Sequence, residues 1–229
     1  DESDREGVRI VVDLKTGQNP EVILNNLYAQ SQLETSFGIN NVAIVDRVPK
    51  VLNLKELLEI FLSHRRSVVS RRTAFDLAKS KDRGHILEGL TIALSNIDPI
   101  IDLIKKSKDP NEAKRKLLAK KWKSTLINNL LKKAGSIDTR PEDIFEEFGL
   151  SGSSYKLSSK QAQAILDLRL QRLTGLEQDN LIKEYEEVLQ DIAALNEILE
   201  NPERLQEVIE EELLSVKEEF GDERKTPIE

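Results

Sequence analysis

The sequence predicts a mainly α-helical protein that has a small α/β piece at its N-terminus and a long antiparallel coiled-coil stalk carrying a helical head. Three observations indicate this. The 45 positions 54–98 contain no proline and would form a rod of about 68 Å if unbroken, which is too long for a compact domain of this size. A second helix near residues 181–199 has heptad spacing. Segments rich in β-branched residues precede residue 54.

Residues 1–53 are predicted to be an α/β piece. Residues 8–14 are mostly apolar and β-branched between two glycines, which predicts a strand. Asn19 and Pro20 can start a helix that runs to Leu33. Residues 37–52 predict a second pair of strands with a turn near Asp46 and Arg47. Because the chain starts abruptly and lacks methionine, we expect this piece to belong to a larger domain whose earlier part is missing. The helix is expected to bury Val22, Ile23, Leu27 and Leu33.

The outgoing helix of the stalk is predicted over residues 54–90. Asn53 can cap its start, and Glu56 completes a capping box. Gly84 and Gly89 are weak helix positions, and Pro99 marks an end or a kink. The apolar stripe of this helix, at spacings of mostly three and four, consists of Leu54, Leu58, Phe61, Val68, Phe75, Ile86, Leu90 and Leu94.

The returning helix of the stalk is predicted over residues 177–200. The intervening ~80 residues must leave one rod and come back to the other, so an antiparallel pair with a globule at its tip is the simplest topology. A last helix is predicted from Pro202, capped by Asn201, to Gly221, within a C-terminal segment 201–229. The heptad stripe of the returning helix consists of Leu181, Tyr185, Val188, Ile192, Leu195 and Leu199.

The head is predicted over residues 91–176. Asp109, Pro110 and Glu112 form a helix-start signal, Gly149 is a plausible helix stop, and residues 151–154 are a loop. Its most apolar stretch is QAQAILDLRLQRLTGLE, residues 161–177, which we interpret as one helix capped by Ser158 and Gly175. Apolar residues lie on more than one face of this helix, so it is buried either inside a helical globule or between two copies. The candidates for such an interface are Ile165, Leu166, Leu168, Leu170 and Leu173.

Composition excludes several kinds of site. The chain has no cysteine, so disulfides and thiol chemistry are absent. Its two histidines, His64 and His85, lie in a cationic helix and are interpreted as surface or stalk residues, not as metal ligands. No serine lies in a nucleophile-elbow pattern, and no glycine belongs to a phosphate-binding loop. No apolar run approaches the ~20 residues needed to cross a membrane.

Charge is unevenly distributed. Residues 177–229 carry 18 acidic and 5 basic side chains, so the C-terminal third is not expected to bind nucleic acid. A first basic cluster consists of Arg65, Arg66, Arg71 and Arg72. Both this cluster and a second one can contact DNA phosphates. Alternatively, they are solvated faces or pair with Glu184, Glu187 and Asp191 of the returning helix. The second cluster consists of Lys114, Arg115, Lys116, Lys120, Lys121 and Lys123.

Four stretches carry a resemblance to a known family: AILDLRLQRLTGLE, NNLYAQSQLETSFGINNVAIV, HRRSVVSRRTAFDLAKSKDRGHILEGL and EVIEEELLSVKEEFGDERKT. In amino-acid sequence and in their order along the chain they resemble the A-subunit family of DNA gyrase, a bacterial type IIA topoisomerase. The resemblance extends from Asp1 to about residue 226 and is weakest over 105–156, for which nothing is carried over.

The resemblance implies a fragment with five parts. These are the end of the tower domain (1–53), the outgoing coiled-coil helix (54–90), the dimerising head or exit gate (91–176), the returning helix (177–200), and a C-terminal helix and tail that pack back on the tower (201–229). It also implies a cytoplasmic, nucleoid-associated parent that forms a homodimer through the head, assembles with the B subunit of DNA gyrase and acts on double-stranded DNA. ATP and magnesium would be used through that B subunit, so no cofactor is expected in this chain.

The family cuts DNA with a tyrosine in an upstream winged-helix domain. Tyr28, Tyr155 and Tyr185 do not match that motif, so no catalytic residue is expected in this chain, which we expect to be inactive alone. Three alternatives remain open. The A subunit of topoisomerase IV has the same architecture. A stand-alone coiled-coil scaffold would associate through the stalk heptads. An independently active enzyme is disfavoured by the missing chemistry.

Overall fold

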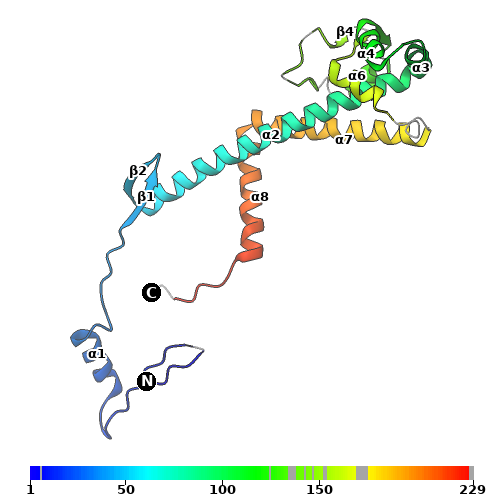
Figure 1. Cartoon of the computed structure of the whole chain (residues 1–229). Coiled ribbons are helices and arrows are strands. Elements are labelled where there is room, and N and C mark those ends of the chain that lie inside the picture. Colours follow the sequence, from blue (N-terminus) through cyan, green and yellow to red (C-terminus); the bar gives the residue numbers. More distant parts are fainter. Residues whose placement is uncertain are drawn as a thin grey trace. The chain divides into compact units, whose positions relative to one another are not determined.

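The computed structural model describes residues 1–5, 7–123, 125–133, 138–141, 143–145, 147–151, 154–168 and 175–226. The chain divides into two compact units, residues 1–58 and residues 59–229. Helices dominate, and a small α/β piece lies at the N-terminus, which confirms the predicted fold class (Figure 1). Among the described helices, none combines the length and apolar character that a membrane crossing requires.

The first unit contains helix α1 (Pro20–Gln30) and a hairpin of β1 (Asn41–Val45) and β2 (Val48–Leu52). Asn19 caps α1 by accepting a hydrogen bond from the Glu21 amide, as expected from its position before proline. The hairpin turns at Asp46 and Arg47, both with positive φ, which is the two-residue turn that suits the twist of paired strands.

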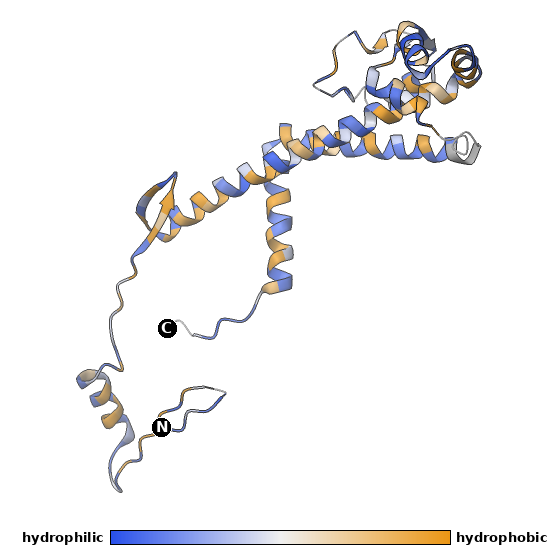
Figure 2. Cartoon of the chain, in the orientation of Figure 1, coloured by the Kyte–Doolittle hydropathy of each residue, from blue (hydrophilic) through white to orange (hydrophobic). Residues whose placement is uncertain are grey.

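Three predictions for the first unit are wrong. Residues 8–14 form no strand, because no other strand pairs with them. Helix α1 ends at Gln30, where Ser31 caps it, and not at Leu33. None of the α1 side chains is buried, and the apolar strand residues Val42, Ile44 and Val51 are also exposed. Figure 2 shows that apolar positions occur along both α1 and the hairpin. The apolar faces of this unit therefore lack cover among the described residues.

In the second unit, helix α2 (Leu54–Ser95) packs along helix α7 (Gly175–Glu200), which runs in the opposite direction (Figure 1). The capping box of Asn53 and Glu56 starts α2 as predicted. Gly84 lies where the helices approach closely, because an added Cβ would stand 3.3 Å from Val188 Cγ1. Arg83 Nε donates to Glu184 Oε1 across the pair at 2.8 Å.

The buried side of α7 agrees with the predicted apolar stripe, whereas the buried side of α2 does not. On α7, Leu181, Tyr185 and Ile192 are buried as predicted. On α2, Phe75 is 69% exposed, and the buried positions at this end of the helix are Val69 and Thr73 instead. The predicted α2 stripe was wrong here because a seam of mixed polar and apolar residues packs against α7 and α8, and apolar spacing alone does not reveal it.

Helix α8 (Pro202–Phe220) follows α7 after one residue, Asn201, whose side chain accepts from the Glu203 amide. The helix ends at Phe220 with Gly221 as its C-cap, as predicted. Its buried residue is Ile209. The α2 side chains Leu62 and Arg66 and the α8 side chains Ile209, Leu213 and Leu214 line an open groove of about 300 Å³.

The head comprises α3 (Ile97–Lys105), α4 (Pro110–Ala119), α5 (Thr125–Lys133) and α6 (Ser159–Leu166), together with a small sheet. The strands β3 (Lys121–Lys123), β4 (Gly149–Ser151) and β5 (Ser154–Lys156) pair antiparallel in the order β3-β5-β4. The head is therefore not purely helical, and Gly149 opens a strand instead of stopping a helix. Three-residue strands were missed because their sequence pattern is too short to detect.

The most apolar stretch of the head, residues 161–177, also differs from the prediction. Ser158 and Gln161 form the expected capping box, but α6 ends at Leu166 with Asp167 as its C-cap. Gly175 begins α7 and is not a C-cap. Residues 169–174, between these two points, lie outside the described residues.

Candidate functional site at the junction of stalk and head

The stalk meets the head where α2 crosses α6, and the two backbones approach closely. A Cβ added at Gly89 would stand 2.6 Å from Gln161 Cγ, closer than real Cβ atoms come to their neighbours. Glycine at this position of α2 therefore lets the side chain of Gln161 lie directly against the helix. This packing requirement accounts for a residue that the sequence indicated only as a weak helix position.

Gln161 is fully buried and connects three elements through its amide group. Its Oε1 accepts from the Ser158 amide at 2.9 Å. Its Nε2 donates to the backbone carbonyl of His85 on α2 and to the hydroxyl of Tyr155 on β5, both at 2.7 Å. One side chain thus joins the start of α6, the small sheet and the stalk.

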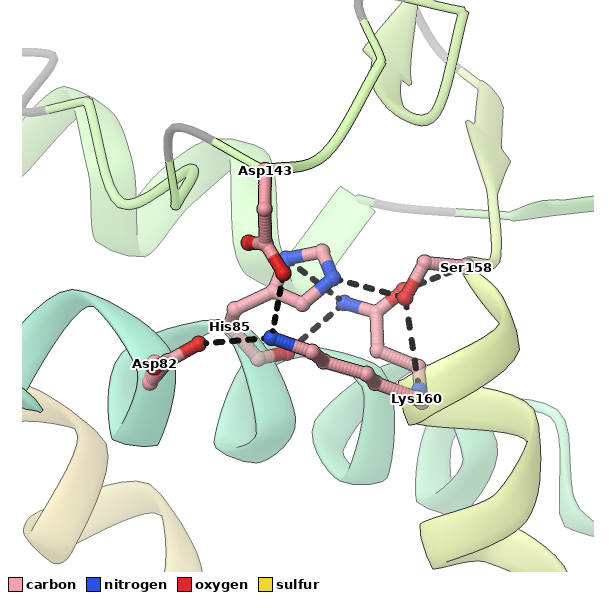
Figure 3. A network of polar contacts seen from close by, with 6 residues as sticks. Asp82, His85, Asp143, Ser158 and Lys160 are labelled. Carbon is pink, nitrogen blue, oxygen red and sulfur yellow. Dashed lines mark hydrogen bonds and ion pairs between the residues drawn. The ribbon is translucent and has the colours of Figure 1, made fainter.

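His85 completes this network as a neutral ring (Figure 3). Gln161 Nε2 lies 3.3 Å from His85 Nδ1, and His85 Nε2 lies 2.7 Å from Ser158 Oγ. The two hydrogens of the Gln161 amide are donated to the His85 carbonyl and the Tyr155 hydroxyl, so the longer contact with Nδ1 does not determine which ring nitrogen carries the proton. Burial, together with the charge of Lys160, lowers the pKa of His85 to about 4, while Asp82 and Asp143 oppose the shift.

An exposed ion cluster lies over the buried network (Figure 3). Lys160 on α6 contacts Asp82 of α2 at 3.1 Å and Asp143 of the head at 2.8 Å. Its hydrogen bonds to Asp143 and Asp82 raise the pKa of Lys160. The cluster therefore ties α6 to the stalk a second time, at the surface.

Glu88 is the second buried titratable group at the junction. It lies on α2 one turn beyond His85 and accepts a hydrogen bond from the Thr139 hydroxyl at 3.0 Å. Burial raises the pKa of Glu88 to about 7, although hydrogen bonds from Thr139 and Tyr155 oppose the shift. Tyr185 of α7 is also buried here, and burial, followed by the charge of Glu88, raises the pKa of its hydroxyl. This region is therefore a polar, nearly charge-free joint between stalk and head.

The four arginines that remain candidates for DNA contact have different neighbours within this chain. Arg65 and Arg72 both form ion pairs with Glu212 of α8. Arg71 donates to the carbonyl of Ser67 in its own helix. Arg66 lines the groove between α2 and α8. Two of the four arginines thus share one carboxylate of the acidic C-terminal helix, whereas the sequence had suggested partners on α7.

The five interface candidates are also separated. Ile165 is 4% exposed and belongs to the core of the head, whereas Leu166 and Leu168 are half-buried at its margin. Leu170 and Leu173 lie outside the described residues. Of the five, Leu166 and Leu168 are the described side chains that retain exposed surface on this chain.

Sequence reasoning missed most of the junction. The histidines were expected to be surface or stalk residues; His64 is exposed, and His85 lies on the stalk helix α2, where it is buried. Glu88 and Thr139 were not singled out for any polar role, and Gln161 was expected only as the capping-box partner of Ser158. The available signal was that Ser158 and Gln161 form a capping box next to a dense apolar run.

The described residues contain no group of three or more His, Cys, Asp or Glu side chains that could hold a metal ion. These residues do not fit a magnesium site, so no step through a metal is assigned to them. The buried groups at the junction are instead arranged to hold α2, α6, α7 and β5 together.

Comparison with known proteins agrees with this architecture. Residues 1–214 match the family described as the A subunit of DNA gyrase/topoisomerase IV. The chain belongs to this A-subunit family. Its relatives include the DNA gyrase A subunit of Pseudomonas aeruginosa, which is 56% identical over 228 residues, all of this chain and 25% of that protein.

Other A-subunit relatives are of similar closeness. The DNA gyrase A subunit of Salmonella typhimurium is 52% identical over 228 residues, 100% of this chain and 26% of the relative. That of Escherichia coli is 53% identical over 185 residues, 81% of this chain and 21% of the relative. The chain therefore spans about a quarter of the length of these family members.

Proposed function

We propose that the chain is the stalk and exit-gate part of a DNA gyrase A subunit. The observation that carries the proposal is that a head with a hydrophobic core lies at the end of the α2 and α7 pair, and that this core is built from α3 to α6, the small sheet and the adjoining parts of α2 and α7. Two such heads meet in a homodimer and part to release a duplex. The half-buried Leu166 and Leu168 lie at the margin of the surface that pairs.

The complete protein is proposed to be an ATP-hydrolysing type II topoisomerase that supercoils DNA in the cytoplasm. It acts with the gyrase B subunit in an A2B2 assembly, in which the B subunit handles ATP and magnesium. The cleaving tyrosine belongs to the preceding winged-helix domain, so the 229-residue chain is proposed to lack cleavage activity. Tyr155 and Tyr185 are buried, whereas Tyr28 is exposed, so for Tyr28 the proposal rests on its mismatch with the family's motif.

The gate proposal is tested by the mass of the chain in solution, measured by sedimentation. The head variant is Leu168→Glu with Leu170→Glu, and the matched stalk variant is Phe75→Glu, which changes an exposed apolar residue of α2. We expect the chain to be a dimer, the head variant a folded monomer and the stalk variant a dimer.

The opposite result would identify a coiled-coil scaffold. If Phe75→Glu abolishes the dimer and the head variant does not, association takes place through the stalk. Circular dichroism of each variant shows whether the fold is retained. For the head variant, a second pair of substitutions at the same positions to serine separates loss of pairing from charge-induced unfolding.

A further inference from the structure

The head carries positive charge that its own acidic groups do not neutralise. Residues 105–123 contain nine basic and two acidic side chains, a net charge of +7 in a chain whose total is −7. Both acids serve the start of α4. Asp109 accepts from the Glu112 amide at 2.7 Å, and Glu112 accepts from the Lys108 amide and pairs with Lys116.

The geometry of β3 turns part of this charge outward. Trp122 is 2% exposed, pairs in register with Tyr155 of β5, and donates its indole N–H to the Leu117 carbonyl. Since side chains alternate along a strand, Lys121 and Lys123 stand on the opposite, exposed face.

The same sheet places like charges next to each other. Lys121 lies directly opposite Lys156 of β5, and such a pair is unfavourable unless an anion is near. Lys156 has Glu147 as a partner at 2.7 Å. Lys121 and Lys123 have no ion pair among the described residues, and neither does the exposed Arg115 of α4. The ammonium group of Lys120 lies 4.7 Å from the Trp122 ring centre.

The stalk shows the opposite arrangement. Arg65 and Arg72 share Glu212, and Arg83 pairs with Glu184, so several cations of α2 are neutralised by the returning helices. The head thus carries its own group of cations without an ion pair among the described residues, in addition to the exposed Arg66, Arg71 and Lys79 of the stalk. We define the basic head face as Arg115, Lys120, Lys121 and Lys123.

We propose that the basic head face binds the phosphate backbone of double-stranded DNA while the duplex passes the gate. The inference rests on the proposed function and assigns a DNA-contact surface to the head, where the sequence favoured the arginines of the stalk. Mobile ammonium groups on flexible stems contact phosphates without reading bases, which suits a surface past which any sequence must move.

The burial of Trp122 indicates which class of nucleic acid the basic head face binds. Proteins that hold single strands stack bases on exposed aromatic side chains. The aromatic residue of this strand faces the core with its polar atom already bonded. The face therefore offers charge without a stacking platform, so a duplex is expected to bind more tightly than a single strand of equal length.

The test is fluorescence anisotropy with a labelled duplex of about 20 base pairs and the 229-residue chain, at several salt concentrations between about 50 and 200 mM. The head variant is Arg115→Gln, Lys121→Gln and Lys123→Gln. The matched control removes three exposed charges from the stalk by Arg66→Gln, Arg71→Gln and Lys79→Gln. All six side chains are exposed, so both variants are expected to fold.

We expect weaker binding by the head variant and a salt slope of log K that is smaller by about 2 to 3, because each lost phosphate contact removes about 0.9 from the slope. The control should keep the slope of the parent chain. An unchanged slope in the head variant, a loss confined to the control, or tighter binding of a single strand of the same length would each overturn the proposal.

The result of the DNA-binding test can be distinguished from the result of the gate test. Sedimentation of the same samples should show that the head variant remains a dimer, since its substitutions lie outside Leu166 and Leu168. A dimer with undiminished DNA binding would contradict the basic head face and leave the gate standing. A chain that never dimerises would contradict the gate, whatever its affinity for DNA.

Discussion

Gln161 Nε2 donates to the backbone carbonyl of His85 across a distance of 2.7 Å, although the two residues are 76 positions apart in the chain. This carbonyl lies in the C-terminal part of α2, close to the head. A buried amide on one helix bonded to the main chain of another fixes both the separation and the register of the two helices. The junction is thus held by directional bonds as well as by apolar packing.

Gly89→Ala is expected to destabilise the second unit by about 1–3 kcal/mol, because the new methyl group would overlap Gln161 and the helices cannot separate without breaking its hydrogen bonds. Thermal unfolding followed by circular dichroism measures the effect. Gly84→Ala should cost less, since its nearest contact would be 3.3 Å instead of 2.6 Å. Equal losses of stability in the two variants would contradict the proposal that the close contact between Gly89 and Gln161 makes substitution more costly there than at Gly84.

Glu88→Gln is expected to stabilise the chain at neutral and alkaline pH. The unfolded carboxyl ionises near the ordinary glutamate pKa of 4.5, while the folded carboxyl keeps its proton up to a pKa of about 7. The folded state thus binds more protons between these values, and stability falls as pH rises from 4.5 through 7. Glutamine removes this loss, which amounts to about 3 kcal/mol above pH 7. Urea unfolding across this pH range should show the difference growing with pH. A difference that is constant over the range would contradict the buried protonated carboxyl.

His85 is expected to show the opposite dependence. Its folded pKa is lowered from 6.5 to about 4, so the unfolded ring gains a proton first as pH falls. Stability from this group is complete above pH 6.5 and is lost as pH falls toward 4. In the wild type the trend of Glu88 opposes it between pH 4.5 and 6.5, and Glu88→Gln should expose it as a steeper rise of stability with pH. Nuclear magnetic resonance of the His85 ring protons should show a midpoint near pH 4, and a midpoint near 6.5 would exclude the buried neutral ring.

Glu212→Gln is expected to weaken the contact between α2 and α8. Burial disfavours the charge of Glu212, but the hydrogen bonds and charges of Arg72 and Arg65 outweigh burial and lower its pKa. Because these side chains are partly exposed, the loss should be about 0.5–1 kcal/mol and should shrink as salt increases. Urea unfolding at low and high salt measures it. Glu218→Gln, on an exposed position of the same helix, should leave stability unchanged.

Local signals in the sequence predicted most helix starts. Asn19, Asn53, Asp109, Ser158 and Asn201 each precede a helix, because a cap is decided by a few neighbouring residues. The turn of the first hairpin and the heptad seam of α7 were predictable for the same reason. The charge distribution and the lack of cysteine could also be taken directly from the sequence.

Contacts between distant segments could not be predicted in this way. Residues 8–14 resemble a strand but have no partner strand among the described residues. The three short strands of the head form by pairing between segments that are distant in the chain, with Trp122 opposite Tyr155. The burial of His85 and Glu88 follows from the position of α6, and the neutralised stalk arginines follow from α8. None of these contacts leaves a local trace in the chain.

The sequence by itself determined the long α2 rod, the helix caps and the excess of basic residues on the head, because each depends on spacing or composition, and its resemblance over four stretches indicated the family. The tertiary structure decided which charges remain free and which buried polar groups join the stalk to the head. The physical reason is that a charge or a hydrogen-bonding group acquires its role from its partners. Those partners, such as Gln161 for His85 and Glu212 for Arg65, lie 76 and 147 residues away.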